Sequence, residues 1–350
     1  MTADEVGSFA KNLPEFDNHK EIVRIENKDL DVVGFIAIHS QKDFHASLGA
    51  TRVWDYKTEA EALSDALRLS RLMSNKSLSA DLPYGGAKAA LMVSKSSPPN
   101  RRELFSWYAE EINKLDGKFV TGSDVGVEEE DVAIMSRVSK FIIGDNVPAG
   151  YYTALGVFNG IEAALEILYG SPEISGKTFA IQGLGKTGLE LLKLLYSKGG
   201  KIIITDADPK KVEQTLKMFP GVVAVNLFGI YVQKVDVFCP CALHNSINSL
   251  SAPQLNCAAI IGSANNQMEN REVELLVRGR GILYAVDYVV NNGGFISVVD
   301  QYQNGVYDDA RIRQKLLLVK NKLKNLLADE LGLIPSGMAA NGFVPSVIKL

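Results

Sequence analysis

The segment Thr178-Phe179-Ala180-Ile181-Gln182-Gly183-Leu184-Gly185-Lys186-Thr187-Gly188 carries the clearest folding signal in this 350-residue chain. Its first five residues are largely apolar and predict a buried strand, and the glycines that follow have the spacing G-x-G-x-x-G. The next residues predict a helix to about Ser197, and Lys201-Ile202-Ile203-Ile204-Thr205 predicts a second strand. Strands that alternate with helices, here and later in the chain, indicate a mostly parallel, doubly wound sheet.

The glycine spacing in this context predicts a dinucleotide-binding turn. Gly183 would permit the tight turn, and Gly185 would let a pyrophosphate come close to the backbone. Gly188 would let the helix pack closely on the strand, and Lys186 and Thr187 complete the candidate cofactor contacts within the turn. The N–H groups that open the helix would meet the phosphates.

Asp206 stands at the end of the second predicted strand, 23 positions after the first glycine of the turn. A carboxylate there would accept hydrogen bonds from the adenosine ribose and repel a 2′-phosphate. NAD is therefore the expected cofactor. Lys210 and Lys211 follow closely, so NADP stays open as an alternative.

Composition limits the partners of the chain. The formal net charge is −4 and no basic run occurs, so neither nucleic acid nor an anionic membrane is an expected partner. No stretch reaches the roughly 18 consecutive apolar residues that a membrane span needs. The start, Met1-Thr2-Ala3-Asp4-Glu5, lacks the pattern of a signal peptide, so a cytoplasmic location is expected.

The cysteines predict no metal centre. Cys239 and Cys241 flank Pro240 at the end of an apolar run, and their spacing to Cys257 and His244 matches none of the usual zinc patterns. Reduced, packed thiols are the favoured interpretation.

The first part of the chain also mixes strands and helices. Val32-Val33-Gly34-Phe35-Ile36-Ala37-Ile38 and residues 52–56 predict strands. Thr58 and Glu61 form a capping-box signature that opens a helix, whose apolar face runs to Met73.

Length and composition predict two domains. Residues 1–147 would form an α/β substrate and oligomerisation domain, and residues 148–307 a Rossmann-type dinucleotide-binding domain. A C-terminal helix within residues 308–350 would pack back on the first domain.

Three charged side chains stand near the ends of the predicted elements in the first domain. Lys76 lies just beyond the last strong apolar position of the helix, Lys88 stands at a turn-to-strand junction after Gly85-Gly86, and Asp124 follows a short strand at residues 119–121. Carboxylates in such loops commonly bind ligands in α/β proteins. A lysine can hold a carboxylate, and a second cation nearby lowers a lysine pKa toward neutrality, which makes it a usable base. Taken singly, each lysine is better explained as a solvated surface residue, and the glycine pair before Lys88 together with the neighbouring segments favours the functional interpretation.

The chain resembles the amino-acid dehydrogenases that act on glutamate, leucine, phenylalanine and valine, and most of all their leucine/phenylalanine branch. The resemblance covers about residues 30 to 330. The segments that carry it are Gly49-Ala50-Thr51-Arg52, Asp65-Ala66-Leu67-Arg68-Leu69, Met73-Ser74-Asn75-Lys76, Gly85-Gly86-Ala87-Lys88, Ser123-Asp124-Val125-Gly126, Thr153-Ala154-Leu155-Gly156-Val157, Pro240-Cys241-Ala242-Leu243, Gly262-Ser263-Ala264-Asn265-Asn266-Gln267 and Asp287-Tyr288-Val289-Val290-Asn291-Asn292-Gly293-Gly294.

This resemblance implies an NAD(P)-dependent enzyme that deaminates an L-amino acid oxidatively to a 2-oxo acid and ammonia, reversibly. It also implies a cleft between the domains that closes on the substrate, and a homo-oligomer whose size the sequence does not define.

The resemblance also assigns roles to residues. Lys76 would bind the substrate α-carboxylate, Lys88 would activate water, and Asp124 would exchange protons with the amino group. The remaining positions are Gly49 and Asn291 for the substrate, and Thr153, Ala242 and Asn265 for the cofactor.

The positions that resemble the substrate side-chain pocket are Leu48, Gly122, Phe295 and Val298. Gly122 would enlarge one wall and Phe295 would fill another, which predicts an apolar substrate with a branched or an aromatic side chain. Tyr151-Tyr152 replaces a segment that is usually small and proline-rich, and it keeps open an unusual amino acid or a biosynthetic imine as substrate. A catalytically silent NAD-binding subunit is the third alternative.

Overall fold

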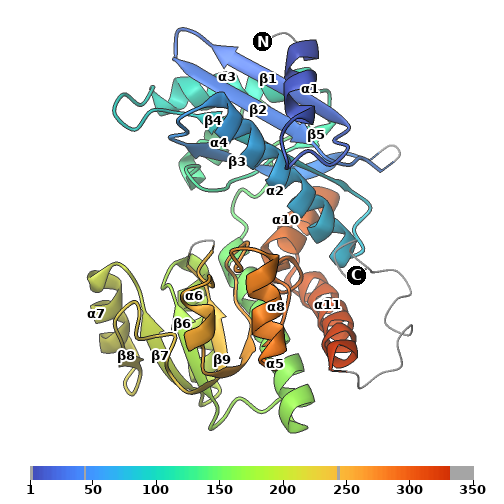
Figure 1. The fold of residues 1–350 in the computed structure, drawn as a ribbon. Helices are drawn as coiled ribbons and strands as arrows, with labels where there is room; N and C mark the ends of the chain where they lie inside the picture. The colour runs from blue at the N-terminus through green and yellow to red at the C-terminus, as the bar shows by residue number, and fades with distance from the viewer. Residues whose placement is uncertain (1–2, 43–44, 243–244, 332–350) are drawn as a thin grey trace. The chain divides into compact units, whose positions relative to one another are not determined.

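The computed structural model describes residues 3–42, 45–242 and 245–331. The chain divides into two compact units, Met1–Val147 and Pro148–Leu350. Each unit has its own sheet, and Figure 1 labels the helices and strands. None of the described helices combines the length and the apolar character that crossing a bilayer requires.

The first unit is built on a five-stranded mixed sheet. Its elements are α1 (Ala3–Lys11), β1 (Glu21–Asn27), β2 (Val32–Ile38), β3 (Ser47–Trp54), α2 (Glu59–Ser79), β4 (Gly85–Met92), α3 (Arg101–Lys114), β5 (Phe119–Val120) and α4 (Glu129–Ser136). The strand order is β1-β2-β4-β3-β5. β2 runs antiparallel to β1 and β4, whereas β3 is parallel to β4 and β5.

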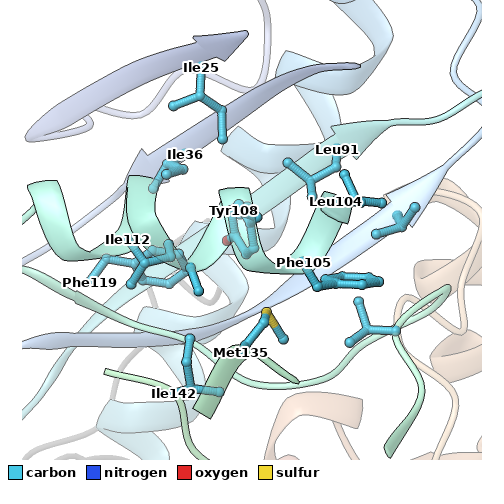
Figure 2. Packing of buried hydrophobic residues seen from close by; sticks show 14 of the residues in the cluster. Ile25, Ile36, Leu91, Leu104, Phe105, Tyr108, Ile112, Phe119, Met135 and Ile142 are labelled. Carbon is cyan, nitrogen blue, oxygen red and sulfur yellow. The ribbon is translucent and has the colours of Figure 1, made fainter. Parts of the chain in front are cut away.

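Both faces of this sheet are buried. In β2, Phe35 and Ala37 belong to the apolar cluster with α2, while Ile36 and Ile38 belong to the cluster with α3. Figure 2 shows the second cluster, with Tyr108 of α3 among its members. Successive side chains of a strand point to opposite faces, so a strand covered on both faces is apolar throughout.

α2 lies directly on β4 because Gly86 has no side chain. A Cβ atom at this position would lie 2.1 Å from the backbone nitrogen of Ser74. The end of the helix is tied to the same region, since the Ser77 hydroxyl donates to the Tyr84 carbonyl at 2.7 Å. The helix therefore continues through Lys76, which lies beyond the last strong apolar position of its sequence pattern, Met73.

The second unit is built on a six-stranded parallel sheet. Its elements are α5 (Ala149–Tyr169), β6 (Thr178–Gln182), α6 (Lys186–Ser197), β7 (Lys201–Thr205), α7 (Pro209–Met218), β8 (Val223–Ala224), β9 (Val235–Pro240), η1 (Ala252–Gln254), β10 (Cys257–Ile260), α8 (Arg271–Gly279), β11 (Leu283–Tyr284), α9 (Asp287–Val290), α10 (Gly293–Asn304) and α11 (Asp309–Glu330).

The strand order β11-β10-β9-β6-β7-β8 places β6 in the middle of this sheet. The chain builds outward from β6 to β7 and β8, then returns to the other side of β6 with β9. This is the order of the doubly wound dinucleotide-binding fold, and it confirms the predicted fold class. Ligands of such sheets bind beyond the carboxyl ends of the strands at this switch point, where β6 ends at Gln182 and β9 at Pro240.

α11 belongs to the second unit. It packs along α5 and also contacts α9 and α10, a surface that the sequence did not predict. Its packing on the first domain stays a prediction. Two ion pairs join it to α5, from Lys320 to Glu162 at 2.6 Å and from Lys324 to Glu166 at 2.7 Å. Amphipathic pattern alone predicted the helix but not the surface that it covers. Residues 332–350 lie outside the described residues.

The divergent tyrosines at the start of α5 bind the first turns of α11. The Tyr152 hydroxyl donates to Asp309 at 3.1 Å, and Arg313 donates to the Tyr151 hydroxyl at 2.6 Å. Arg313 also bonds to Asp309 at 2.7 Å, which closes the set. These side chains therefore fasten α5 to α11.

Gly86→Ala should destabilise the first unit by about 1–3 kcal/mol, because the added methyl group must push α2 away from β4. Gly7→Ala in α1 is the control, since no described atom lies within 4 Å of its Cβ position. Urea unfolding followed by the fluorescence of Trp54 and Trp107, both in the first unit, measures the effect. Equal stability of the two variants would contradict the close helix–strand contact.

Candidate active site

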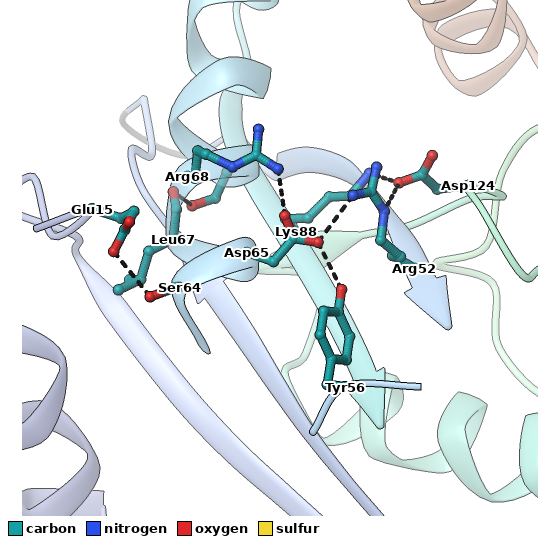
Figure 3. A network of polar contacts seen from close by, with 10 residues as sticks. Glu15, Arg52, Tyr56, Ser64, Asp65, Leu67, Arg68, Lys88 and Asp124 are labelled. Atoms are coloured by element: carbon teal, nitrogen blue, oxygen red, sulfur yellow. Dashed lines mark hydrogen bonds and ion pairs between the residues drawn. The ribbon is translucent and has the colours of Figure 1, made fainter. Parts of the chain in front are cut away.

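Lys88 and Asp124 form a buried ion pair in the first unit (Figure 3). Lys88 lies within β4, and Asp124 lies in the loop after β5. The Lys88 Nζ atom is 2.7 Å from Asp124 Oδ2, and the two side chains are 6% and 20% exposed. The structure thus brings together the two residues that the sequence singled out for catalysis.

The strand register positions Lys88. Ala90, two residues further along β4, packs in the cluster with α2, so Lys88 points to the same face of the sheet. Lys88 pairs with Ala37 of β2 and Ala50 of β3, whose small side chains leave room for it. The sequence placed Lys88 at a turn, but β4 begins at Gly85 and includes the glycine pair.

The loop that carries Asp124 runs along β3. Backbone hydrogen bonds of 2.9 Å join Thr51 N–H to the Gly122 carbonyl and Val53 N–H to the Val125 carbonyl. These bonds hold the loop on both sides of Asp124. The carboxylate therefore faces the sheet from a fixed backbone position.

Sequence reasoning missed the residues that surround this pair. Arg52 of β3 donates through Nε to Asp124 Oδ2 at 3.1 Å and through Nη1 to Asp65 Oδ2 at 2.9 Å. Asp65 of α2 also accepts from the Tyr56 hydroxyl at 2.6 Å and pairs with Arg68. Two signals in the sequence could have identified them. Arg52 is a charged residue in a strand predicted to be buried, and Asp65 is an acid beside alanines on a helix face.

Burial and neighbouring charges set the pKa values of the pair. Burial lowers the pKa of Lys88 below its ordinary value; Asp124 opposes this effect and Arg52 adds to it. For Asp124, burial acts to raise the pKa, but Lys88 and Arg52 outweigh it, so the pKa lies well below its usual range. Asp124 thus stays ionised at neutral pH, while the Lys88 amine loses its proton more readily than an ordinary lysine.

Packing in the first unit constrains three further predicted substrate residues. Leu48 is fully buried. A Cβ atom at Gly49 would lie 1.8 Å from the Ala87 carbonyl oxygen, and one at Gly122 would lie 2.7 Å from the Ile143 carbonyl oxygen. Glycine at position 122 is therefore required by neighbouring backbone, and its place in the wall of the substrate pocket stays a prediction.

The glycine turn of the second unit fits a pyrophosphate. Gly183 has a φ of +98°, and a Cβ atom there would lie 2.8 Å from the Ala242 nitrogen. At Gly188 a Cβ atom would lie 2.0 Å from the Gly183 carbonyl oxygen. By contrast, no described atom lies within 4 Å of the Cβ position of Gly185, which caps α6 without a side-chain hydrogen bond. Open space beside uncapped helical N–H groups is what a phosphate needs.

Asp206 is tied to this turn. Its Oδ2 accepts from Leu184 N–H at 2.6 Å, and its Oδ1 accepts from Asp208 N–H at 2.8 Å. The half-buried carboxylate follows β7 directly, where the sequence analysis expects the ribose contact. Lys186 is exposed and Thr187 is half-buried at the start of α6.

The predicted asparagines form a second polar group in this unit. Asn291 donates through Nδ2 to Asn265 Oδ1 at 2.9 Å and to the Ser263 carbonyl at 3.2 Å. Its own Oδ1 is buried and accepts no hydrogen bond from the described residues. A buried acceptor of this kind fits a donor from a bound ligand.

Thr153 joins two helices. Its hydroxyl donates to the Ala149 carbonyl at 2.8 Å and accepts from Gly294 N–H at 3.1 Å, so it caps α10 from α5. Phe295 and Val298 lie one turn apart on α10, and both are half-buried.

Among the described residues, no three histidine, cysteine, aspartate or glutamate side chains are grouped to hold a metal ion. Burial raises the pKa of Cys239 and Cys241, which disfavours the thiolate form that binds metals. His244 lies outside the described residues.

Similarities to known proteins agree with this geometry. Residues 19–140 match the family description Glu/Leu/Phe/Val dehydrogenase, dimerisation domain, and residues 205–329 match Glutamate/Leucine/Phenylalanine/Valine dehydrogenase. The L-tryptophan dehydrogenase of Nostoc punctiforme is 38% identical over 289 residues, which are 81% of this chain and 80% of that protein. The phenylalanine dehydrogenase of Caldalkalibacillus thermarum is 34% identical over 342 residues, which are 94% of this chain and 91% of that protein.

A solved structure is similar as well. The crystal structure of L-tryptophan dehydrogenase from Nostoc punctiforme has a TM-score of 0.76 at 33% identity and covers 94% of each chain. The fold and these similarities define an oxidoreductase that acts on amino acids. The chain belongs to the glutamate/leucine/phenylalanine/valine dehydrogenase family, which confirms the predicted family.

Asp124→Asn should destabilise the first unit far more than Lys88→Met. The first change leaves Lys88 and Arg52 buried without their shared carboxylate, at a cost of about 3 kcal/mol. The second change removes a buried amine, and folding already makes it unfavourable for this amine to hold a proton. The free energy of unfolding at neutral pH should therefore fall by less than about 1 kcal/mol. Urea unfolding followed by tryptophan fluorescence compares the two, and equal losses would be the opposing result.

The same pair predicts how stability changes with pH. Because the folded pKa of Asp124 is depressed, its stabilisation is present above the pKa of the unfolded carboxyl, about 3.9, and is lost as pH falls. Because the folded pKa of Lys88 is also depressed, the unfolded state holds this proton more tightly. Stability therefore rises with pH between the folded and unfolded pKa of Lys88.

Proposed function

We propose that this chain catalyses the reversible NAD-dependent oxidative deamination of an apolar L-amino acid to the 2-oxo acid and ammonia. The observation that carries the proposal is the buried Lys88–Asp124 ion pair at 2.7 Å, in a chain whose second unit has the glycine turn. The pair supplies a base and an ionised acid side by side, as the removal of an amino group requires.

The proposed roles follow from the charges. A bound nicotinamide would supply the hydride acceptor for the α-hydrogen of the amino acid. Lys76 binds the α-carboxylate as a point charge, and Asp124 accepts a proton from the substrate ammonium. Lys88 in its neutral form takes a proton from the water that adds to the α-carbon. One amino acid, one NAD⁺ and one water give one 2-oxo acid, one ammonium, one NADH and one proton.

The proposed substrate class is apolar. Leu48, Phe295 and Val298, which are carried over by resemblance, offer no charge for an acidic side chain. The relatives are named for tryptophan, phenylalanine, leucine and valine, which keeps both aromatic and branched side chains within the proposal. The hydroxyls of Tyr151 and Tyr152 bind α11, so these tyrosines no longer support an unusual substrate, and Phe295 is the remaining reason to test one.

We also propose NAD as the cofactor and a homo-oligomer as the working form. Asp206 supports NAD by its position, and the exposed Lys210 and Lys211 are the reason to test NADP. The match of residues 19–140 to a dimerisation domain supports an oligomer. The cytoplasmic location stays a prediction.

A panel of L-amino acids tests the reaction. NADH should form with at least one of leucine, valine, phenylalanine and tryptophan, and far less with glutamate. Lys88→Ala should lower kcat/KM by about a thousandfold, because the base is lost. Lys57→Ala is the control, since this lysine of the same unit is 71% exposed. Retained NADH binding without turnover on any panel member would instead support a silent subunit.

Asp206→Ala tests the cofactor. It should weaken NADH binding by about tenfold or more and bring the dissociation constants of NADH and NADPH closer together, because charged hydrogen bonds to the ribose are lost. Asp208→Ala is the control, since this residue caps α7 through Lys210 N–H at 2.9 Å. An unchanged ratio of the two constants, measured by fluorescence titration, would refute the ribose contact.

A further inference from the structure

Arg52 connects the Lys88–Asp124 pair to a second half-buried acid, Asp65. Its guanidinium donates from Nε to Asp124 Oδ2 at 3.1 Å and from Nη1 to Asp65 Oδ2 at 2.9 Å. Lys88 contacts the same oxygen of Asp124 at 2.7 Å, so one carboxylate oxygen lies between two cations (Figure 3). Arg52 makes no hydrogen bond to Lys88. It therefore affects the Lys88 amine by orienting the Asp124 carboxylate and by the electrostatic effect of its own charge.

The charges of this group do not balance. Lys88, Arg52 and Arg68 are cations, and Asp124 and Asp65 are the anions that face them. With all of these groups ionised, the set carries one surplus positive charge. Guanidinium groups keep their protons, so the Lys88 amine is the member that can release the surplus near neutral pH.

The position and the planar shape of the Arg52 guanidinium let it bind two carboxylates at once. Its planar fork presents separate N–H groups to two carboxylates, from the loop after β5 and from α2, which a lysine ammonium cannot reproduce at fixed distances. The groups that face Lys88 are Asp124 from that loop, Arg52 from β3 and Asp65 from α2. Tyr56 completes the group by donating to Asp65 at 2.6 Å.

We propose that Arg52 is a positioning residue of the deamination reaction, which orients the Asp124 carboxylate toward Lys88 and keeps a surplus positive charge beside the Lys88 amine. This inference rests on the proposed function. Burial and the nearby guanidinium both lower the pKa of Lys88, in agreement with the geometry. Asp65 and Tyr56 hold Arg52 in place from the other side.

Arg52→Gln tests the charge. In the deamination direction, the limb of kcat/KM that rises with pH should move to higher pH by about 1 unit, because the amine loses a neighbouring cation. The pKa of the substrate amino group in solution is the same for every variant. A shift of the pH limb therefore reports a change in the protein. The rate of Lys88 acetylation by acetic anhydride, followed by peptide mass spectrometry with exposed Lys57 as reference, should show the same shift without any turnover.

Arg24→Gln is the matched control. Arg24 of β1 also makes a two-pronged contact with an acid of α2, with bonds of 2.8 Å from Nε and Nη2 to Glu59. Its side chain is 12% exposed, compared with 18% for Arg52. Its loss should leave both the pH limb and the acetylation midpoint of Lys88 unchanged.

Arg52→Lys separates charge from geometry and serves if the glutamine variant fails to fold. It keeps the cation but loses the fork, so kcat should fall by about tenfold while the limb stays within about half a unit of the parent. An acetylation midpoint that is unchanged in folded Arg52→Gln, or a lysine variant with full activity, overturns the proposal. If the parent chain has no turnover, the proposed function fails, and the acetylation midpoints still decide the role of Arg52.

Discussion

The burial of an ammonium group against a sheet is the constraint on which the first unit depends. Lys88 lies in the middle of β4 under α2, where an unpaired charge would cost several kcal/mol. Asp124 must therefore reach it, and the loop after β5 follows β3 to bring it there. Gly86, two residues earlier, lets α2 come close enough to exclude water. The residues proposed for catalysis are thus also residues on which the packing of this unit depends.

The sequence predicted much of this, for identifiable reasons. The apolar periods and the glycine spacing marked the strands around the switch point, because a parallel sheet covered on both faces needs continuous apolar runs. Lys88 and Asp124 were singled out because they follow distinctive local motifs. The contact between Arg52 and Asp65 was not predicted, because the two residues are 13 positions apart in the sequence and meet only through strand register and helix position.

Other features could not be predicted, also for physical reasons. The reason for glycine at position 122 depends on the Ile143 carbonyl, a contact between segments that sequence periodicity does not report. The packing of α11 along α5 was not predicted, because an amphipathic helix shows that one face is buried, but not against which partner. The charges of Lys320 and Lys324 match acids of α5, and this match is visible only when the two helices are side by side.

The fastening of α5 to α11 by Tyr151, Tyr152, Asp309 and Arg313 has a consequence for modularity. The first and the last described helices of the second unit are stapled together at the point where the chain enters that unit. Recombination between relatives would therefore preserve this fastening only when residues 148–331 move as one block. A chimaera with its crossover between α10 and α11 would keep the two tyrosines but could lose Asp309 and Arg313. The start of α5 would then no longer be bonded to α11.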